Sequence, residues 1–332
     1  QVGGERTTVQ LVDITIEHGE YHFSYEKLDR YITLAQSHGF WNFEISHPFT
    51  QWGARFAPKV VATKNGKLQK IFGWETAATS APYIAFIRSF LFALKAHLQT
   101  LGVFENSYFH VSDEPGEEQL ESYRAALNIV RDIYEDCKVI DALSDYSFYQ
   151  LGLVKHPIPS NDHITPFLEN GVTPLWTYYC CGQSIDVSNR FLAMPSARNR
   201  IIGHQFFKYD IAGFLQWGYN FWYNQYARHL IDPLAVTDAE EAFPGGDAFS
   251  VYPSPDGTPL ASLRQVVFNE ALQDLRAMKL LSAYSSKEEV LALCSTIDSG
   301  ELTFSNYPQN PEFLLRTREL INKELLKYGK SS

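Results

Sequence analysis

Short apolar runs alternate with longer amphipathic stretches along most of the chain. Runs rich in β-branched and aromatic residues predict strands, and apolar residues spaced three and four apart predict helices. The predicted strands are residues 9–16, 40–45, 107–111, 138–142, 163–164, 173–179, 212–217 and 249–252. The predicted helices are 25–37, 82–101, 117–134, 148–151, 197–208 and 263–281, followed by 287–294 and 311–328. Such alternation is typical of parallel βα units.

The order of these elements predicts an α/β protein with a (β/α)8 barrel of the TIM type. We expect residues 1–332 to form a single catalytic domain, with the barrel at about 9–281 and a C-terminal helical extension at 282–332. A doubly wound open sheet is the competing architecture. It has little support, because no G-x-G-x-x-G follows the first predicted strand and the sequence contains no P-loop.

Composition narrows the possible partners. A net charge of −10 argues against binding to a phosphate backbone, so no nucleic acid partner is expected. No apolar run approaches the roughly 20 residues of a membrane span, so no membrane partner is expected either. The start, QVGGERTTVQ, shows no signal peptide and no initiator Met, so the N-terminus looks trimmed. The compartment, whether cytoplasmic or secreted, and the oligomeric state stay open.

In a TIM barrel the active site lies where the strands end at their carboxyl side. Carboxylates, amides and aromatic side chains follow the predicted strands, and this mixture suits a sugar, which offers both apolar ring faces and hydroxyls. The candidate residues are His47, Trp52, Asp113, Glu114, Asp145, Tyr178, Tyr179, Trp217, Asn220, Asp247 and Tyr252.

The strongest local signal is FHVSDEPG at 109–116, with two consecutive carboxylates at a predicted strand end. Asp113 and Glu114 should repel each other, so one can stay ionised while the other holds a proton, as a glycosidase requires. Pro115 is expected to hold Glu114 in an extended conformation. Both carboxylates can serve one pocket only if the backbone twists there. The alternative is that they cap the helix that follows.

The aromatic candidates and one histidine have structural alternatives. Trp217 and Trp52 are candidate platforms for stacking against a sugar ring, or else core residues. His47 is a candidate donor or acceptor for sugar hydroxyls, or else a structural histidine.

The remaining polar candidates also have structural alternatives. Asn220 and Asp247 are candidate ligands of the sugar O4 and O6, or else turn-stabilising residues. Tyr252 lines the pocket or fills the barrel mouth. Asp145 is a lower-ranked contact.

Other catalytic chemistries lack their motifs in this sequence. There is no HExxH or HxH pattern, no zinc-type cysteine spacing among the four cysteines, and no G-x-S-x-G nucleophile elbow. We therefore expect no metal and no cofactor.

Several stretches together resemble the catalytic domain of glycoside hydrolase family 123 and its wider relatives, known as domain of unknown function 4091. They are FEISHPFTQWGA (43–54), FHVSDEPG (109–116), LWTYYCCGQ (175–183), GFLQWGYNFW (213–222), PGGDAFSVYP (244–253) and SLRQVVFNEALQDLRAMKLL (262–281). They follow one another in order and span most of the chain.

The resemblance implies a (β/α)8 barrel and a retaining β-N-acetylgalactosaminidase that acts on a glycan or glycoconjugate by substrate-assisted catalysis. It implies that Asp113 orients and stabilises the 2-acetamido group, and that Glu114 is the general acid and then the base. Tyr178 or Tyr179 would hold the acetamido carbonyl. Such hydrolases usually carry a β-sandwich domain before the barrel, whereas this chain starts at the first predicted strand.

Two alternatives remain. One is a glycosidase that acts on a sugar without an acetamido group. The other is a catalytically silent carbohydrate-binding barrel.

Overall fold

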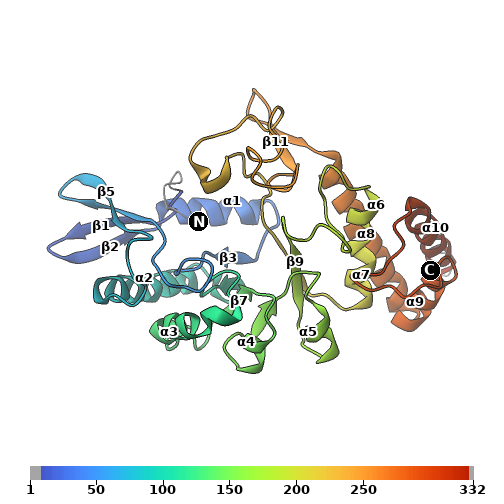
Figure 1. The fold of residues 1–332 in the computed structure, drawn as a ribbon, viewed down its shortest axis with the longest axis horizontal. Coiled ribbons are helices and arrows are strands. Elements are labelled where there is room, and N and C mark those ends of the chain that lie inside the picture. The colour runs from blue at the N-terminus through green and yellow to red at the C-terminus, as the bar shows by residue number, and fades with distance from the viewer. Residues whose placement is uncertain (1–8, 329–332) are drawn as a thin grey trace. The chain divides into compact units, whose positions relative to one another are not determined.

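The computed structural model describes residues 9–328 of the chain. These residues belong to two compact units (Figure 1). Among the described residues, the first unit comprises 9–158 with 226–229, and the second comprises 159–225 with 230–328. The expectation that residues 1–332 act as a single catalytic domain stays a prediction.

A small, mainly antiparallel sheet forms one part of the first unit (Figure 1). Its strands, in the spatial order β2-β1-β4-β5, are β1 Asp13–Glu17, β2 Glu20–Ser24, β4 Val60–Lys64 and β5 Lys67–Phe72. His18-Gly19 and Asn65-Gly66 join the two hairpins, and all four residues have positive φ. Two consecutive positive φ angles define the type I′ turn that matches the twist of a hairpin.

A parallel sheet forms the other part of the first unit. Its strands, in the order β3-β6-β7-β8, are β3 Phe43–Ile45, β6 Ser107–Phe109, β7 Lys138–Ala142 and β8 His156–Ile158. The helical segments of this unit are α1 Glu26–Ser37, α2 Ala81–Thr100, η1 Phe104–Asn106, η2 Glu117–Gln119, α3 Leu120–Val130 and α4 Ser147–Gln150.

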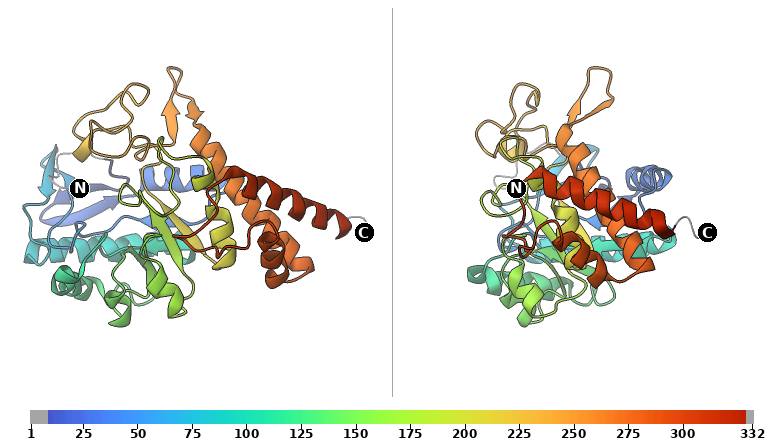
Figure 2. Two further views of the ribbon diagram at one scale, coloured as in Figure 1. Left: turned by 45° about the vertical axis from the view of Figure 1, so that its right-hand side comes forward. Right: turned by 90° about the vertical axis from the view of Figure 1, so that its right-hand side faces the viewer.

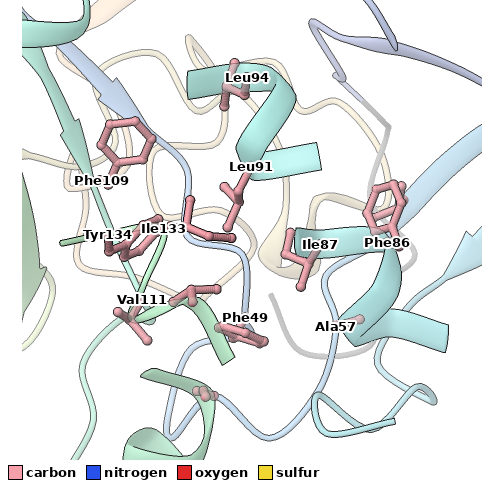
Figure 3. Packing of buried hydrophobic residues seen from close by; sticks show 14 of the residues in the cluster. Phe49, Ala57, Phe86, Ile87, Leu91, Leu94, Phe109, Val111, Ile133 and Tyr134 are labelled. Carbon is pink, nitrogen blue, oxygen red and sulfur yellow. The ribbon is translucent and has the colours of Figure 1, made fainter. Parts of the chain in front are cut away.

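Apolar side chains from helices and strands make the core of the first unit. Phe86 and Leu91 of α2 pack in one cluster with Phe109 of β6 and with Phe49, which follows β3 (Figure 3). Val111 lies in the same cluster and is fully buried. Burial of this residue anchors the segment that leads from β6 into Asp113.

The second unit contains a parallel strand pair and most of the long C-terminal helices. The strands are β9 Trp176–Tyr179, parallel to β10 Gly213–Gln216, and the antiparallel pair β11 Val251–Pro253 and β12 Pro259–Ala261. The helices are α5 Thr165–Glu169, α6 Ala197–Arg200, α7 Ile202–Lys208, α8 Leu263–Tyr284, α9 Lys287–Ser295 and α10 Pro311–Tyr328. The 3-10 turn η3, Gln225–Ala227, begins at the last residue before the 226–229 segment that belongs to the first unit.

Helices α8, α9 and α10 pack against one another (Figure 2). The carboxylate of Asp274 on α8 is fully buried and binds Arg200 of α6 at 2.7 Å and Arg318 of α10 at 2.8 Å. Gly203 of α7 allows a very close approach to α8, because a Cβ atom there would lie 2.1 Å from the carbonyl oxygen of Ala271.

The expected (β/α)8 barrel is wrong, although the α/β class holds. Among residues 9–328 the strands form two four-stranded and two two-stranded sheets, and none of these closes on itself. The first expected strand pairs within the antiparallel sheet, and the eighth lies in the antiparallel pair β11-β12. A barrel of this type needs parallel neighbours on both sides of every strand, whereas β1 is parallel to β4 but antiparallel to β2, and β11 is antiparallel to β12.

Candidate active site

Asp113 and Glu114 lie just after β6, at a sharp bend held from two sides. The backbone N–H of Trp52 donates to the carbonyl of Asp113 at 2.8 Å, and the N–H of Glu114 donates to the carbonyl of Ala142, at the end of β7, also at 2.8 Å. Glu114 has a φ of 45°. The extended conformation expected for Glu114 is therefore wrong.

The bend at Glu114 provides the backbone twist that two adjacent carboxylates need to depart from strict strand alternation. A left-handed conformation costs a non-glycine residue about 1–2 kcal/mol, so the surrounding contacts must impose it. Backbone strain of this kind concentrates at functional sites.

The N-cap positions of the helical segments that follow the two carboxylates are held by other residues. The 3-10 turn η2 has Gly116 at its N-cap, and α3 has Gln119 there. The backbone N–H of Gly116 donates to the side-chain oxygen of Gln119 at 3.0 Å, so this turn is closed by its own residues. Asp113 and Glu114 thus precede the N-cap residues of both helical segments.

The surroundings of Asp113 favour its protonated form. Burial, followed by the negative charge of Glu114, raises the pKa of Asp113 to about 7, and the positive charge of His110 opposes that rise. At neutral pH this carboxyl group can therefore change its charge in response to a nearby ligand.

The other candidates in the first unit are Trp52, His47 and Asp145. Trp52 is 46% exposed, with a φ of 58°, and its backbone N–H donates to the carbonyl of Asp113. The ring of His47 is hydrogen-bonded to the carbonyl of Phe49. Asp145 accepts from the N–H of Ser147 at 3.0 Å, which is a turn-stabilising contact ahead of α4.

Trp217 and Asp247 lie together in the second unit, around the buried Arg190. The indole N–H of Trp217 donates to Asp247 Oδ1 at 3.4 Å. The guanidinium of Arg190 donates to the backbone carbonyls of Trp217 at 2.9 Å and Asp247 at 2.6 Å. Burial raises the pKa of Asp247 to about 6, while Arg190 opposes that rise. Its Oδ2 atom has no hydrogen-bond partner among the described residues.

The two candidate tyrosines differ in their surroundings although they are neighbours on β9. Tyr179 is fully buried, its hydroxyl donates to Asn199 Oδ1 at 3.3 Å, and Arg190 lies over its ring at 5.1 Å. Tyr178 is also buried, and its side chain leaves the strand on the opposite face. The hydroxyl of Tyr179 is thus already engaged within the protein.

Tyr252 and Asn220 each take part in local structure of the second unit. The hydroxyl of Tyr252 accepts from Arg264 at 3.1 Å. Asn220 is exposed and forms an antiparallel bridge with Phe249. These contacts fix the two residues locally, and their role toward a sugar stays a prediction.

Comparison with known proteins decides the family. A model of the glycoside hydrolase 123 catalytic domain matches residues 1–281. The chain belongs to glycoside hydrolase family 123. The resemblance seen in the sequence is thereby confirmed.

A solved family 123 glycoside hydrolase from Clostridium perfringens, described for its glycolipid glycan hydrolysis, shares the fold with a TM-score of 0.66. The two sequences are 19% identical, and the match covers 97% of this chain. This chain spans 58% of the length of that relative. A search of curated proteins found no match.

Three polar residues of this family 123 chain that the sequence did not single out lie beside the bend at Asp113 and Glu114. They are Glu44 on β3, His110 just before the bend and Asp141 on β7. The sequence held one signal for this group, which is that Asp141 stands within the apolar run VIDAL. Asp141 is fully buried, and a buried charge needs partners.

Two other features of the described residues bear on the site. No group of three or more His, Cys, Asp or Glu side chains within residues 9–328 is arranged to hold a metal ion. No helix in the same range is long and apolar enough to cross a membrane.

Proposed function

We propose that this chain is a retaining glycoside hydrolase that removes terminal β-linked N-acetylhexosamine, with N-acetylgalactosamine the preferred sugar. Membership of family 123 supports glycoside hydrolysis of a glycan or glycoconjugate. The observation that carries the finer proposal is the Asp113–Glu114 bend, with a strained Glu114 and a pKa of Asp113 near neutrality.

The proposed reaction uses the 2-acetamido group of the substrate as the nucleophile, so no separate protein nucleophile is needed. In the first step the acetamido oxygen attacks the anomeric carbon while Glu114 protonates the leaving oxygen, and the glycosidic bond breaks. Ionised Asp113 accepts a hydrogen bond from the acetamido N–H and offsets the positive charge of the resulting oxazolinium ion.

In the second step Glu114, now a carboxylate, takes a proton from a water molecule that attacks the anomeric carbon. The oxazolinium ring opens and the sugar leaves with its original configuration. Tyr178 or Tyr179 would hold the acetamido carbonyl.

The remaining candidates are proposed to bind the sugar. Trp217 and Trp52 would stack against the ring, and the free oxygen of Asp247 supports a hydrogen bond to a sugar hydroxyl. His47, Asp145, Asn220 and Tyr252 complete the proposed set.

The deciding experiment is release of 4-nitrophenol from matched aryl β-glycosides of N-acetylgalactosamine, N-acetylglucosamine, galactose and glucose. We expect turnover of the N-acetyl sugars alone and inhibition by a thiazoline mimic of the oxazolinium ion. Turnover of galactose or glucose without thiazoline inhibition would rule out the acetamido mechanism. If none of the four aryl glycosides is turned over, and N-acetylgalactosamine-terminated glycolipids are not turned over either, a binding protein would be favoured over an enzyme.

A further inference from the structure

A network of charged side chains lies next to the bend at Asp113 and Glu114. Its members come from three neighbouring parallel strands of the first unit, or directly follow one of them. The ring of His110 is buried, with Nδ1 3.2 Å from Asp141 Oδ1 and Nε2 2.9 Å from Glu44 Oε1. Glu44 is on β3, His110 directly follows β6, and Asp141 is on β7. The imidazole therefore bridges the two strands that flank β6.

Asp141 is the centre of this group. Its carboxylate is fully buried and accepts from four donors: the His110 ring, the Tyr123 hydroxyl, and the backbone N–H groups of Val111 at 3.0 Å and Ser112 at 3.4 Å. Val111 and Ser112 immediately precede Asp113. The side chain of Asp141 thus fixes the backbone immediately before Asp113 and Glu114.

The neighbouring backbone contacts act on the same few residues. The N–H of Glu114 is bound to the carbonyl of Ala142, the residue after Asp141. The hydroxyl of Ser112 donates to the carbonyl of Thr50 at 2.8 Å. Strand β7 therefore holds both ends of the segment 111–114, at Asp141 and at Ala142.

The charges of this group also affect the pKa of Asp113. Burial lowers the pKa of His110, but its hydrogen bonds to Asp141 and Glu44 outweigh this effect and raise that pKa to about 10. Burial raises the pKa of Asp141, and its hydrogen bonds from His110, Tyr123 and Val111 oppose that rise. The charged groups that act on Asp113 are Glu114, His110, Asp141 and Glu44, and among these only His110 favours its ionised form.

We propose that Asp141, with His110 as its charged partner, is a positioning residue for the catalytic pair: it locks the 111–114 segment into the bend that Glu114 requires. The positive charge of His110 in turn opposes the protonation of Asp113. This proposal rests on the proposed function, because it assumes that Asp113 and Glu114 are catalytic. Neither Asp141 nor His110 touches the substrate in this scheme.

The test compares Asp141→Ala, Asp141→Asn and His110→Gln with the wild type, using the aryl N-acetylgalactosaminide. Asp141→Ala should lower kcat about 10- to 100-fold with little change in KM, because a displaced catalytic group slows the chemical step. Asp141→Asn keeps an acceptor for the Val111 and Ser112 N–H groups, so it should recover part of kcat. His110→Gln should move the acidic limb of the pH profile of kcat/KM to higher pH.

Asp274→Asn is the matched control, because Asp274 is also a fully buried carboxylate with charged partners but lies on α8 in the second unit. It should lower Tm while leaving kcat and the acidic limb unchanged. The positioning role is overturned if the Asp141 variants behave like this control, or if His110→Gln leaves the acidic limb in place.

Glu114→Gln, assayed alongside on an N-acetylgalactosaminide with a poor leaving group, where acid assistance is needed, separates the two proposals. Full activity of Glu114→Gln, or no turnover by the wild type, would refute the proposed function. A crystal structure of Asp141→Ala then decides the positioning proposal without activity: we expect Glu114 to leave its positive φ, and an unchanged 111–114 bend overturns the proposal. Loss of activity in Glu114→Gln, with wild-type kcat in Asp141→Ala, would refute the positioning role alone.

Discussion

At the scale of single residues, the two neighbouring carboxylates have different surroundings, which supports the different tasks proposed for them. Asp113 follows directly from the bound segment 111–112, and its pKa of about 7 reflects burial and the charge of Glu114. Glu114 occupies the strained position. The division between a charge-stabilising aspartate and an acid–base glutamate leads to separate predictions for the two.

Replacement of Glu114 by Gln removes the proton donor while keeping the size of the side chain. We expect kcat/KM to fall by about 10²–10⁴-fold on substrates with poor leaving groups, and far less on activated aryl glycosides, because acid assistance matters most when the leaving oxygen is basic. A series of aryl glycosides of graded leaving-group pKa measures this. Equal losses across the series would contradict the acid role.

Replacement of Asp113 by Asn removes a negative charge that is needed most in the transition state. We expect kcat to fall by about 10²–10³-fold with a small change in KM. Because the wild-type pKa is raised to about 7, wild-type kcat/KM should decline as the pH falls through 7 and the carboxylate gains a proton. The pH profile of Asp113→Asn should lack this decline at acidic pH. A rise in KM without a fall in kcat would refute the role proposed for Asp113.

At the scale of elements, the sequence predicted the regular segments that have clear periodicity. Strand β7 and helix α10 begin and end at the predicted residues, and α1, α2 and α8 differ from prediction by at most three residues at an end. Strands β2, β4 and β5 were missed. In β5 the burial pattern runs from four exposed residues to a single buried one, so it gives no alternating signal.

Two further differences have non-local causes. The fifth strand was expected at residues 163–164, whereas β8 is His156–Ile158, a stretch of three residues that is identified by its pairing with β7. The local preference of a residue before proline misled the prediction for Glu114. Hydrogen bonds from Trp52 and to Ala142, which are distant in sequence, decide that conformation.

Helix α7 offers a test of packing between elements. Gly203→Ala would place a Cβ atom 2.1 Å from the carbonyl oxygen of Ala271, a backbone atom that cannot move without shifting α8. We expect a loss of about 1–3 kcal/mol in the free energy of unfolding, as is usual for overpacking. Gly182→Ala is the control, since a Cβ atom added there would meet nothing within 4 Å. Equal stabilities by chemical denaturation would contradict the close approach.

At the scale of the whole molecule, the α/β class and the family were predictable, while the barrel was not. Family membership follows from stretches spread over most of the chain, so a few misplaced strands do not affect it. A closed barrel depends on every strand joining one ladder, and the antiparallel pairing of β1 with β2 and of β11 with β12 removes two of the eight expected strands.

The family match ends at residue 281, yet the fold of the second unit continues beyond it. Val290, Cys294 and Ile321 complete the cluster around Met278, and Arg318 binds buried Asp274. We expect a chain that ends at Leu281 to lose soluble yield, or to show a Tm lower by many degrees, because apolar surface and a buried carboxylate lose their partners. Size-exclusion chromatography and thermal unfolding measure this; an unchanged Tm would contradict it.

The four donors that share Asp141 have a consequence for sequence variation. Because one carboxylate satisfies His110, Tyr123, Val111 and Ser112 together, the effect of changing any one of these contacts depends on whether the others are intact. Substitutions around this residue should therefore be epistatic. An evolving or engineered lineage would have to alter His110, Tyr123 and Asp141 jointly.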